Sequence, residues 1–190
     1  GHAGDLRIFL GGADGMRVNV AAENDLLQPQ ATGFLASARV IHELLPCVHT
    51  ETQPATGTTE PMALQTGRYA TQTGVFRNEI NLPPDQPTLA QVFKAGGYAT
   101  GYIGKWHLAA QDPVPPDLRG GYDYWLAANH LEFVSDAYDA RLFDGDGNEQ
   151  KLPGYRVDAQ TDAAIRYIDR HRDTPFLLFM SFLEPHHQNH

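Results

Sequence analysis

The stretch YATGYIGKWH, residues 98–107, decides the fold and provides the first candidate site. Its apolar residues predict a buried strand that stops at Gly104, and Lys105, Trp106 and His107 follow directly. Open α/β sheets place ligands at the carboxyl ends of their strands. A cation, an aromatic wall and an imidazole delivered there favour an anion-binding catalytic pocket. A Lys and a His on an ordinary surface loop would fit the same residues.

Helical and strand patterns alternate on both sides of this stretch. Residues 85–97 predict an amphipathic helix that leads into it, and residues 157–168 predict a second helix. Continuous apolar runs at 6–10 and 176–183 predict strands that are buried on both faces. This alternation predicts an α/β fold, a three-layer α/β/α sandwich with a mostly parallel central sheet. Residues 144–148, DGDGN, are typical of a hairpin turn.

Composition narrows the classes of function. The chain of 190 residues suits one domain, and its net charge of -9 argues against binding nucleic acid. The single cysteine, Cys47, allows neither an internal disulfide nor a thiolate zinc site. No apolar run approaches the roughly 20 residues that span a bilayer. We therefore expect a small-molecule or glycan ligand and no membrane span, and the sequence carries no signal for an oligomeric state.

Asp14 is the first candidate metal ligand. It follows the apolar run 6–10 in a glycine-rich loop, where a carboxylate can bind a hard divalent cation. A turn aspartate that caps its own loop fits the residues as well.

Thr58 is the candidate nucleophile. Thr58 or Thr59 precedes Glu60-Pro61 and predicts the start of a short helix that continues to Gln65. A hydroxyl at a helix N-terminus can attack an ester that the free amides and a metal help to hold. A plain N-cap is the simpler interpretation of the same threonine.

Taken together, the residues resemble the amino-terminal half of a sulfatase of the alkaline-phosphatase-like superfamily. Five segments, spread over more than half of the chain, carry the resemblance: TGRYATQTGV (66–75), LPPDQPTLAQVFKAGGYATGYIGKWHL (82–108), GGYDYW (120–125), the segment 154–165 and PFLLFMSFLEPHHQNH (175–190). The resemblance implies a sulfuric ester hydrolase, and it suggests a periplasmic or secreted protein.

The resemblance also implies roles for individual residues. Lys105 and His107 would bind the sulfate and assist the leaving group, and His186 would do likewise. His187 is able to exchange roles with His186, because the double His leaves the register open. Asp14 would be a ligand of a single calcium or magnesium ion.

Two departures from the sulfatase pattern keep other functions open. Gly57 stands where sulfatases carry the Cys or Ser that becomes formylglycine, and Pro61 stands at the arginine of the same motif. In addition, Asp14-Gly15 replaces the usual consecutive aspartates, as in phosphodiesterases of the superfamily, which use a Thr nucleophile and two zinc or manganese ions. The alternatives are therefore a phosphodiesterase or phosphatase with Thr58 as nucleophile, or a non-catalytic homologue that binds anions or sulfated glycans.

The family's remaining metal ligands and a second active-site Lys have no match in this sequence. One aspartate alone is a poor site for a cation that prefers about six or more oxygens. We therefore expect residues 1–190 to be the amino-terminal part of a single catalytic domain, with an incomplete sheet and no activity in isolation.

Overall fold

The computed structural model describes residues 59–184 and, by their backbone pairing, two earlier strands, β1 (Leu6–Gly11) and β2 (Val18–Ala21). Within these residues no helix combines the length and the apolar character that crossing a membrane requires.

A single seven-stranded sheet runs through the molecule in the order β2-β1-β7-β3-β4-β5-β6. The later strands are β3 (Ala99–Lys105), β4 (Tyr124–Ala128), β5 (Ala140–Asp144), β6 (Glu149–Leu152) and β7 (Phe176–Ser181). The central strand β3 is parallel to both β7 and β4, whereas the pairs on either side of these three strands are antiparallel. The predicted parallel sheet is therefore confirmed at its centre, and its flanks are antiparallel.

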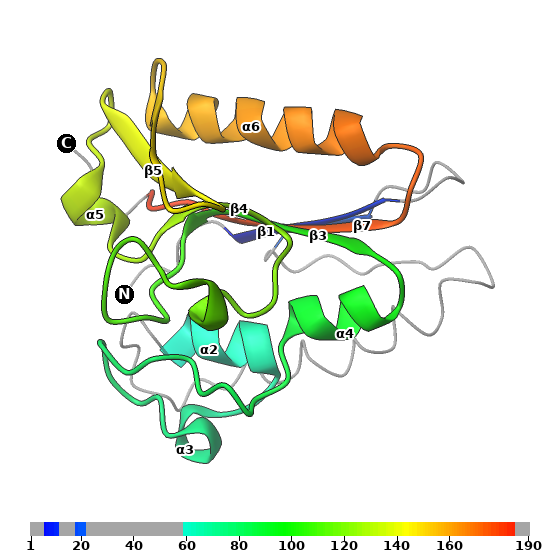
Figure 1. Ribbon diagram of the computed structural model, residues 1–190, viewed down its shortest axis with the longest axis vertical. Coiled ribbons are helices and arrows are strands. Elements are labelled where there is room, and N and C mark those ends of the chain that lie inside the picture. The colour runs from blue at the N-terminus through cyan, green and yellow to red at the C-terminus, as the bar shows by residue number, and fades with distance from the viewer. Residues whose placement is uncertain (1–5, 12–17, 22–58, 185–190) are drawn as a thin grey trace.

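Helices cover both faces of the sheet, as predicted. Figure 1 shows α6 (Arg156–His171) on one face, and α2 (Thr59–Thr66) and α4 (Leu89–Ala95) on the other. The remaining short helices are α3 (Ala70–Thr73), the 3-10 turn η2 (Pro116–Leu118) and α5 (Leu131–Val134). The α/β/α layering of the prediction is confirmed.

Side chains alternate from β3 and β7 into two separate cores. Tyr102 and Phe179 point to the face of α2 and α4, where they pack with Trp106 and Trp125. Ile103 and the alternate residues of β7 point to the face of α6, in a cluster that includes Leu126, Phe176, Leu178 and Met180. Because both faces are covered, β7 needs a continuous apolar run rather than an alternating one.

The helix before β3 begins later than the sequence pattern predicts. Thr88 caps α4: its hydroxyl accepts from the Gln91 amide at 3.3 Å, and the Gln91 side chain accepts from the Thr88 amide at 3.1 Å. Leu89 and Phe93 are buried as predicted, but Val92 is 44% exposed. The sequence pattern therefore wrongly included Val92 in the buried face of this helix.

Two other predictions concern the ends of elements. The helix predicted from Thr58 or Thr59 to Gln65 is α2, and Gly67 follows it in a left-handed conformation with φ 66°. The turn at DGDGN joins β5 to β6, and the Asp144 carboxylate accepts from the amides of Asp146 and Asn148. Strand β4 was not predicted, because aromatic and turn-forming residues on either side obscured its short apolar run.

The close approach of the parallel neighbours β3 and β7 depends on Gly104. Its φ is +112°, and a Cβ atom there would lie 1.9 Å from the carbonyl oxygen of Ser181. Only a residue without a side chain allows the two strands to approach this closely.

A fully buried arginine binds the segment that follows the carboxyl end of β7. The Arg156 guanidinium donates from Nε and Nη2 to Oε1 of Glu184, at 3.1 and 2.6 Å, and from Nη1 to the carbonyl of Ser135 at 2.8 Å. Arg156 is 0% exposed. The start of α6, the segment after α5 and the residues after β7 are therefore held together by one side chain.

Candidate active site

The candidate site lies where β3 and β4 end at their carboxyl edge. Gly104 and Lys105 pair with Ala127 and Ala128, and beyond the strand the Trp106 amide still donates to the Ala128 carbonyl at 2.8 Å. The Tyr102 hydroxyl donates to the Lys105 carbonyl at 2.5 Å. These contacts fix the backbone that carries the lysine.

Trp106 is an anchor in the core and not a wall of the pocket. Its indole is 0% exposed and packs edge-on against Tyr102 and Trp125, with ring centroids 4.9 and 5.3 Å apart. The interpretation of this aromatic as a ligand-facing surface is therefore wrong. The buried indole instead sets where the chain turns, and the next residue adopts φ 59° at His107, a conformation uncommon for a residue with a side chain.

Lys105 forms an ion pair that the sequence did not predict. Its Nζ lies 2.9 Å from Oε1 of Glu132 on α5, and the two side chains are only 12% and 7% exposed. Burial alone would raise the pKa of the Glu132 carboxyl. A hydrogen bond from its own backbone, the contact with Lys105 and the nearby His107 outweigh burial, so this pKa is lowered. Glu132 is therefore a carboxylate near neutral pH.

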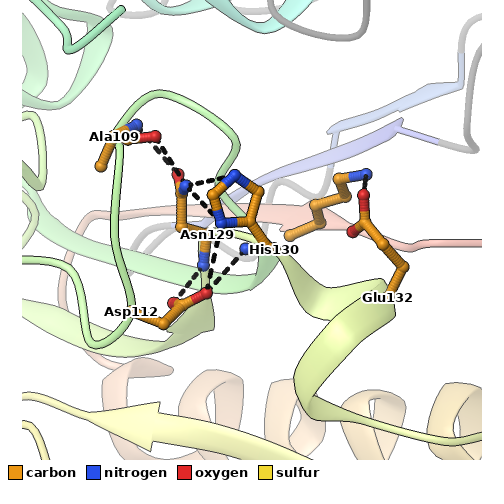
Figure 2. Close-up of polar contacts among 6 residues, drawn as sticks. Ala109, Asp112, Asn129, His130 and Glu132 are labelled. Atoms are coloured by element: carbon orange, nitrogen blue, oxygen red, sulfur yellow. Dashed lines mark hydrogen bonds and ion pairs between the residues drawn. The ribbon is translucent and has the colours of Figure 1, made fainter. Parts of the chain in front are cut away.

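A second group of polar residues supports the loop beside His107. The Asp112 carboxylate accepts from the amides of Asn129, at 2.6 Å, and His130, at 2.8 Å. The fully buried Asn129 side chain exchanges two hydrogen bonds with the backbone of Ala109, at 2.9 and 2.6 Å. Figure 2 draws these residues together with the Glu132 side chain, which makes its drawn contact with Lys105 and none with this group. The loop 107–112 is thereby tied to the end of β4.

His107 lies between the two groups. Its amide donates to the Asn129 carbonyl at 3.2 Å, and its ring meets the His130 ring edge-on with centroids 5.8 Å apart. His107 is 7% exposed. The structure thus brings the predicted Lys105 and His107 to one edge and adds Glu132, His130 and Asp112 to them.

The other predicted site residues lie outside the described residues. These are Asp14, Thr58, His186 and His187, so their roles stay predictions. Strand β1, which precedes Asp14, runs antiparallel to β7 and ends with Gly11 beside Phe176, at the edge opposite Lys105. Among residues 59–184 and the two early strands, no group of three or more His, Cys, Asp or Glu side chains is placed to hold a metal ion.

The polar residues that follow β4 were missed, although one pattern in the sequence indicates them. The apolar run of β4 is followed by Asn129, His130 and Glu132, just as the apolar run of β3 is followed by Lys105 and His107. Parallel neighbours place such residues at the same edge of a sheet.

Comparison with protein families identifies the domain to which this edge of the sheet belongs. The family model described as Sulfatase matches residues 24–190. The chain belongs to the sulfatase family. Its GKWH segment and the residues that surround it are therefore part of a sulfatase domain, and the resemblance noted from the sequence is confirmed.

Two curated sulfatases illustrate the similarity. The Ulvan-active sulfatase of Formosa agariphila is 38% identical over 130 residues, which are 65% of this chain and 25% of that protein. The N-acetylglucosamine-6-O-sulfatase of Bacteroides thetaiotaomicron is 30% identical over 122 residues, which are 64% of this chain and 20% of that protein. The chain thus matches a quarter or less of the length of these two relatives.

Solved sulfatase structures share the fold. A structure described as a complex with its substrate D-Glucosamine-2-N,6-O-disulfate has a TM-score of 0.56 and 28% identity, and the match covers 71% of this chain and 26% of that one. A structure from work on glycosaminoglycan metabolism by Bacteroides thetaiotaomicron has a TM-score of 0.60 at 21% identity, and the match covers 70% of this chain and 33% of that one. The described sheet and helices correspond to part of a larger sulfatase fold.

Proposed function

We propose that the whole protein containing this chain is a sulfuric ester hydrolase, with Lys105 and His107 forming its anion pocket. The observation that carries the proposal is Lys105, whose side chain is only 12% exposed, at the carboxyl edge of β3 within a sulfatase domain. The Lys105 ammonium would bind a sulfuryl oxygen, and charge stabilisation of this kind is worth about 10²- to 10³-fold in rate. His107 would give a hydrogen bond or a proton to the departing alcohol oxygen.

The charge of the site favours a singly charged ester. Glu132 already neutralises Lys105, so the pair offers little excess positive charge to an incoming anion. A sulfate monoester carries one negative charge, whereas a phosphate monoester carries up to two near neutral pH. The ion pair therefore supports a sulfate ester over a phosphate monoester, and His186, with His187 in the same role, would complete the contacts to the leaving group.

The proposed cofactor is one divalent cation, calcium or magnesium, with Asp14 among its ligands. Such a cation would polarise the ester and balance the charge that develops on it. The described residues do not form a metal site by themselves. The proposal for the metal rests on the family resemblance and on the oxygen chemistry of an aspartate. The direction of β1 counts against Asp14 as that ligand, because β1 ends at the edge of the sheet opposite Lys105.

A second candidate function follows from Gly57, which occupies the position of the sulfatase nucleophile. Thr58 would then attack a phosphate ester with the help of two zinc or manganese ions. A homologue without a nucleophile, which binds sulfated glycans, is the third candidate.

The decisive experiment compares Lys105→Ala with Lys94→Ala in the protein expressed from its full natural reading frame. Lys94 is the matched control, because it pairs with Asp123 on the surface and its side chain is 52% exposed. We expect Lys105→Ala to lower kcat/KM for sulfate esters by about 10²- to 10³-fold, with an unchanged circular dichroism spectrum. Normal turnover in this variant would refute the anion pocket.

Two further measurements separate the candidates. Thr58→Ala should abolish turnover of phosphate esters if that residue is the nucleophile, and should leave binding of inorganic sulfate intact in a non-catalytic homologue. Elemental analysis of the same preparation should give about one calcium or magnesium ion per chain for a sulfatase. Two zinc or manganese ions would favour the phosphoesterase instead.

A further inference from the structure

One oxygen of the buried Glu132 carboxylate has no partner among the residues that the structure describes. Oε1 holds Lys105 at 2.9 Å, whereas Oε2 is buried and makes no hydrogen bond to any other residue that the structure describes. The Glu132 side chain is 7% exposed. An unpaired buried carboxylate oxygen is costly, so a group that binds there would be strongly favoured.

The chemistry of this oxygen limits what can bind it. The lowered pKa keeps Glu132 ionised, so Oε2 can only accept a hydrogen bond. A sulfate group offers no hydrogen atom and would be repelled by the carboxylate. A metal ion at Oε2 would lie close to the Lys105 ammonium, which already occupies Oε1. The fitting partner is therefore a neutral O–H or N–H donor.

The position of Glu132 indicates where that donor belongs. Glu132 lies on α5, directly after the end of β4, and the charges of Lys105 and His107 help to lower the pKa of its carboxyl. In Figure 2 its side chain extends from α5 to the contact with Lys105, on the side of His130 away from Asp112. A group bound to Oε2 would be next to an anion held by Lys105, which is where the alcohol part of a sulfate ester would lie.

We propose that Glu132 is a specificity-determining residue that recognises the sugar carrying the sulfate ester. Its Oε2 accepts a hydrogen bond from a hydroxyl or N–H group close to the esterified oxygen, while Oε1 keeps Lys105 directed at the sulfate. This inference rests on the proposed sulfatase function. It predicts that the site selects sulfated sugars over aryl sulfates, which have no such donor.

The experiment measures binding by titration calorimetry to the full-length protein and to its Glu132→Gln variant. The probes are inorganic sulfate, p-nitrophenyl sulfate and a panel of hexose and hexosamine monosulfates. Glutamine keeps the shape and a neutral contact to Lys105 but can place an N–H donor where Oε2 was. We expect Glu132→Gln to weaken the best-bound sugar sulfate by about tenfold or more, the value of a hydrogen bond to a charged group.

Controls distinguish recognition from support of Lys105. Binding of inorganic sulfate and p-nitrophenyl sulfate should not weaken in Glu132→Gln, because the variant removes a negative charge beside Lys105 and takes away no hydrogen bond that these probes make. Glu149→Gln, which removes an exposed carboxylate of the β5–β6 hairpin, should change none of the three. Glu132→Asp keeps the charge but draws it back by one methylene group, so it should lose the same selectivity. This variant provides the test if Glu132→Gln does not fold.

The possible failures are separable. If the wild-type protein binds inorganic sulfate but Glu132→Gln weakens all probes equally, or none of them, the recognition role of Glu132 is refuted and the sulfatase proposal stands. A panel in which no sugar sulfate binds more tightly than p-nitrophenyl sulfate refutes it as well. If the wild-type protein binds no sulfate probe at all, the proposed function fails, and this inference fails with it.

Discussion

Two arginine–carboxylate pairs in this molecule have almost the same geometry and opposite surroundings. Arg156 donates from Nε and Nη2 to one oxygen of Glu184, at 3.1 and 2.6 Å. Arg141 donates from the same two atoms to one oxygen of Asp139, at 2.9 and 2.6 Å. The Arg156 side chain is 0% exposed, whereas that of Arg141 is 39% exposed.

The difference shows that the hydrogen-bond distance alone does not determine how much each ion pair contributes to stability. Around Asp139, hydrogen bonds from Lys151 and Arg141 lower the pKa of the carboxyl, but water competes for all three charges. Arg156 has no such competition and joins three segments that meet near the end of β7. The Lys105–Glu132 pair is largely shielded from water like the first, with side chains 12% and 7% exposed, and in each of the two pairs the second carboxylate oxygen has no hydrogen-bond partner among the described residues. What sets the Lys105–Glu132 pair apart is its place at the carboxyl edge of β3, beside His107.

The largest effect should follow removal of the buried arginine. Arg156→Ala leaves the Glu184 carboxylate and the Ser135 carbonyl without their donors, and we expect a loss of about 3–5 kcal/mol in the free energy of unfolding. Urea denaturation of the full-length protein measures it. Arg166→Ala, an exposed position on the same helix, is the matched control. Similar losses in the two variants would mean that burial does not distinguish these arginines.

A smaller, pH-dependent effect is expected at Glu132. Its folded-state pKa is lowered from 4.5, so its contribution to stability is fully present above that pH and is lost as the pH falls through the lowered pKa. The difference in thermal midpoint between wild type and Glu132→Gln should therefore be constant from pH 7 to about pH 5 and shrink in more acidic solution. A difference that stays constant down to pH 3 would contradict the ionised state assigned to Glu132.

The smallest effect should come from the exposed arginine. Arg141→Ala breaks contacts to Asp139 and Glu149 that solvent largely replaces. We expect the thermal midpoint to move by less than about 2 °C, because exposed ion pairs contribute little net stability. Raising the salt concentration should reduce even this shift. A loss as large as that of Arg156→Ala would overturn the comparison.

The sequence predicts the central layers well because their signals are local. Each of these signals lies within a few consecutive residues. They are the continuous apolar run of β7, the helix pattern before β3 and the GKWH segment. The antiparallel direction of β1 has no such signal, because pairing partners are chosen by packing across the whole sheet. Strand β4 was missed for a related reason. Its short apolar run indicates a strand only when the neighbouring β3 is taken into account.

The candidate site could be predicted only in part. Lys105 and His107 follow a strong strand signal, and a family resemblance gives them roles. Glu132 lies 27 positions away from Lys105 in the chain, and only folding brings them together. Trp106 was misread because an aromatic beside a candidate pocket has the same sequence signature whether it faces the ligand or the core.

The close approach of β3 to β7 at Gly104 has a consequence for how the GKWH motif can vary. Even alanine would place a carbon atom 1.9 Å from the Ser181 carbonyl oxygen, so the constraint comes from a backbone atom that no second substitution can trim away. In a saturation-mutagenesis library we expect position 104 to accept no residue but glycine, with no suppressor on the neighbouring strand. The first letter of GKWH is thus dictated by backbone geometry, and we expect it to be required even in a homologue without catalytic activity.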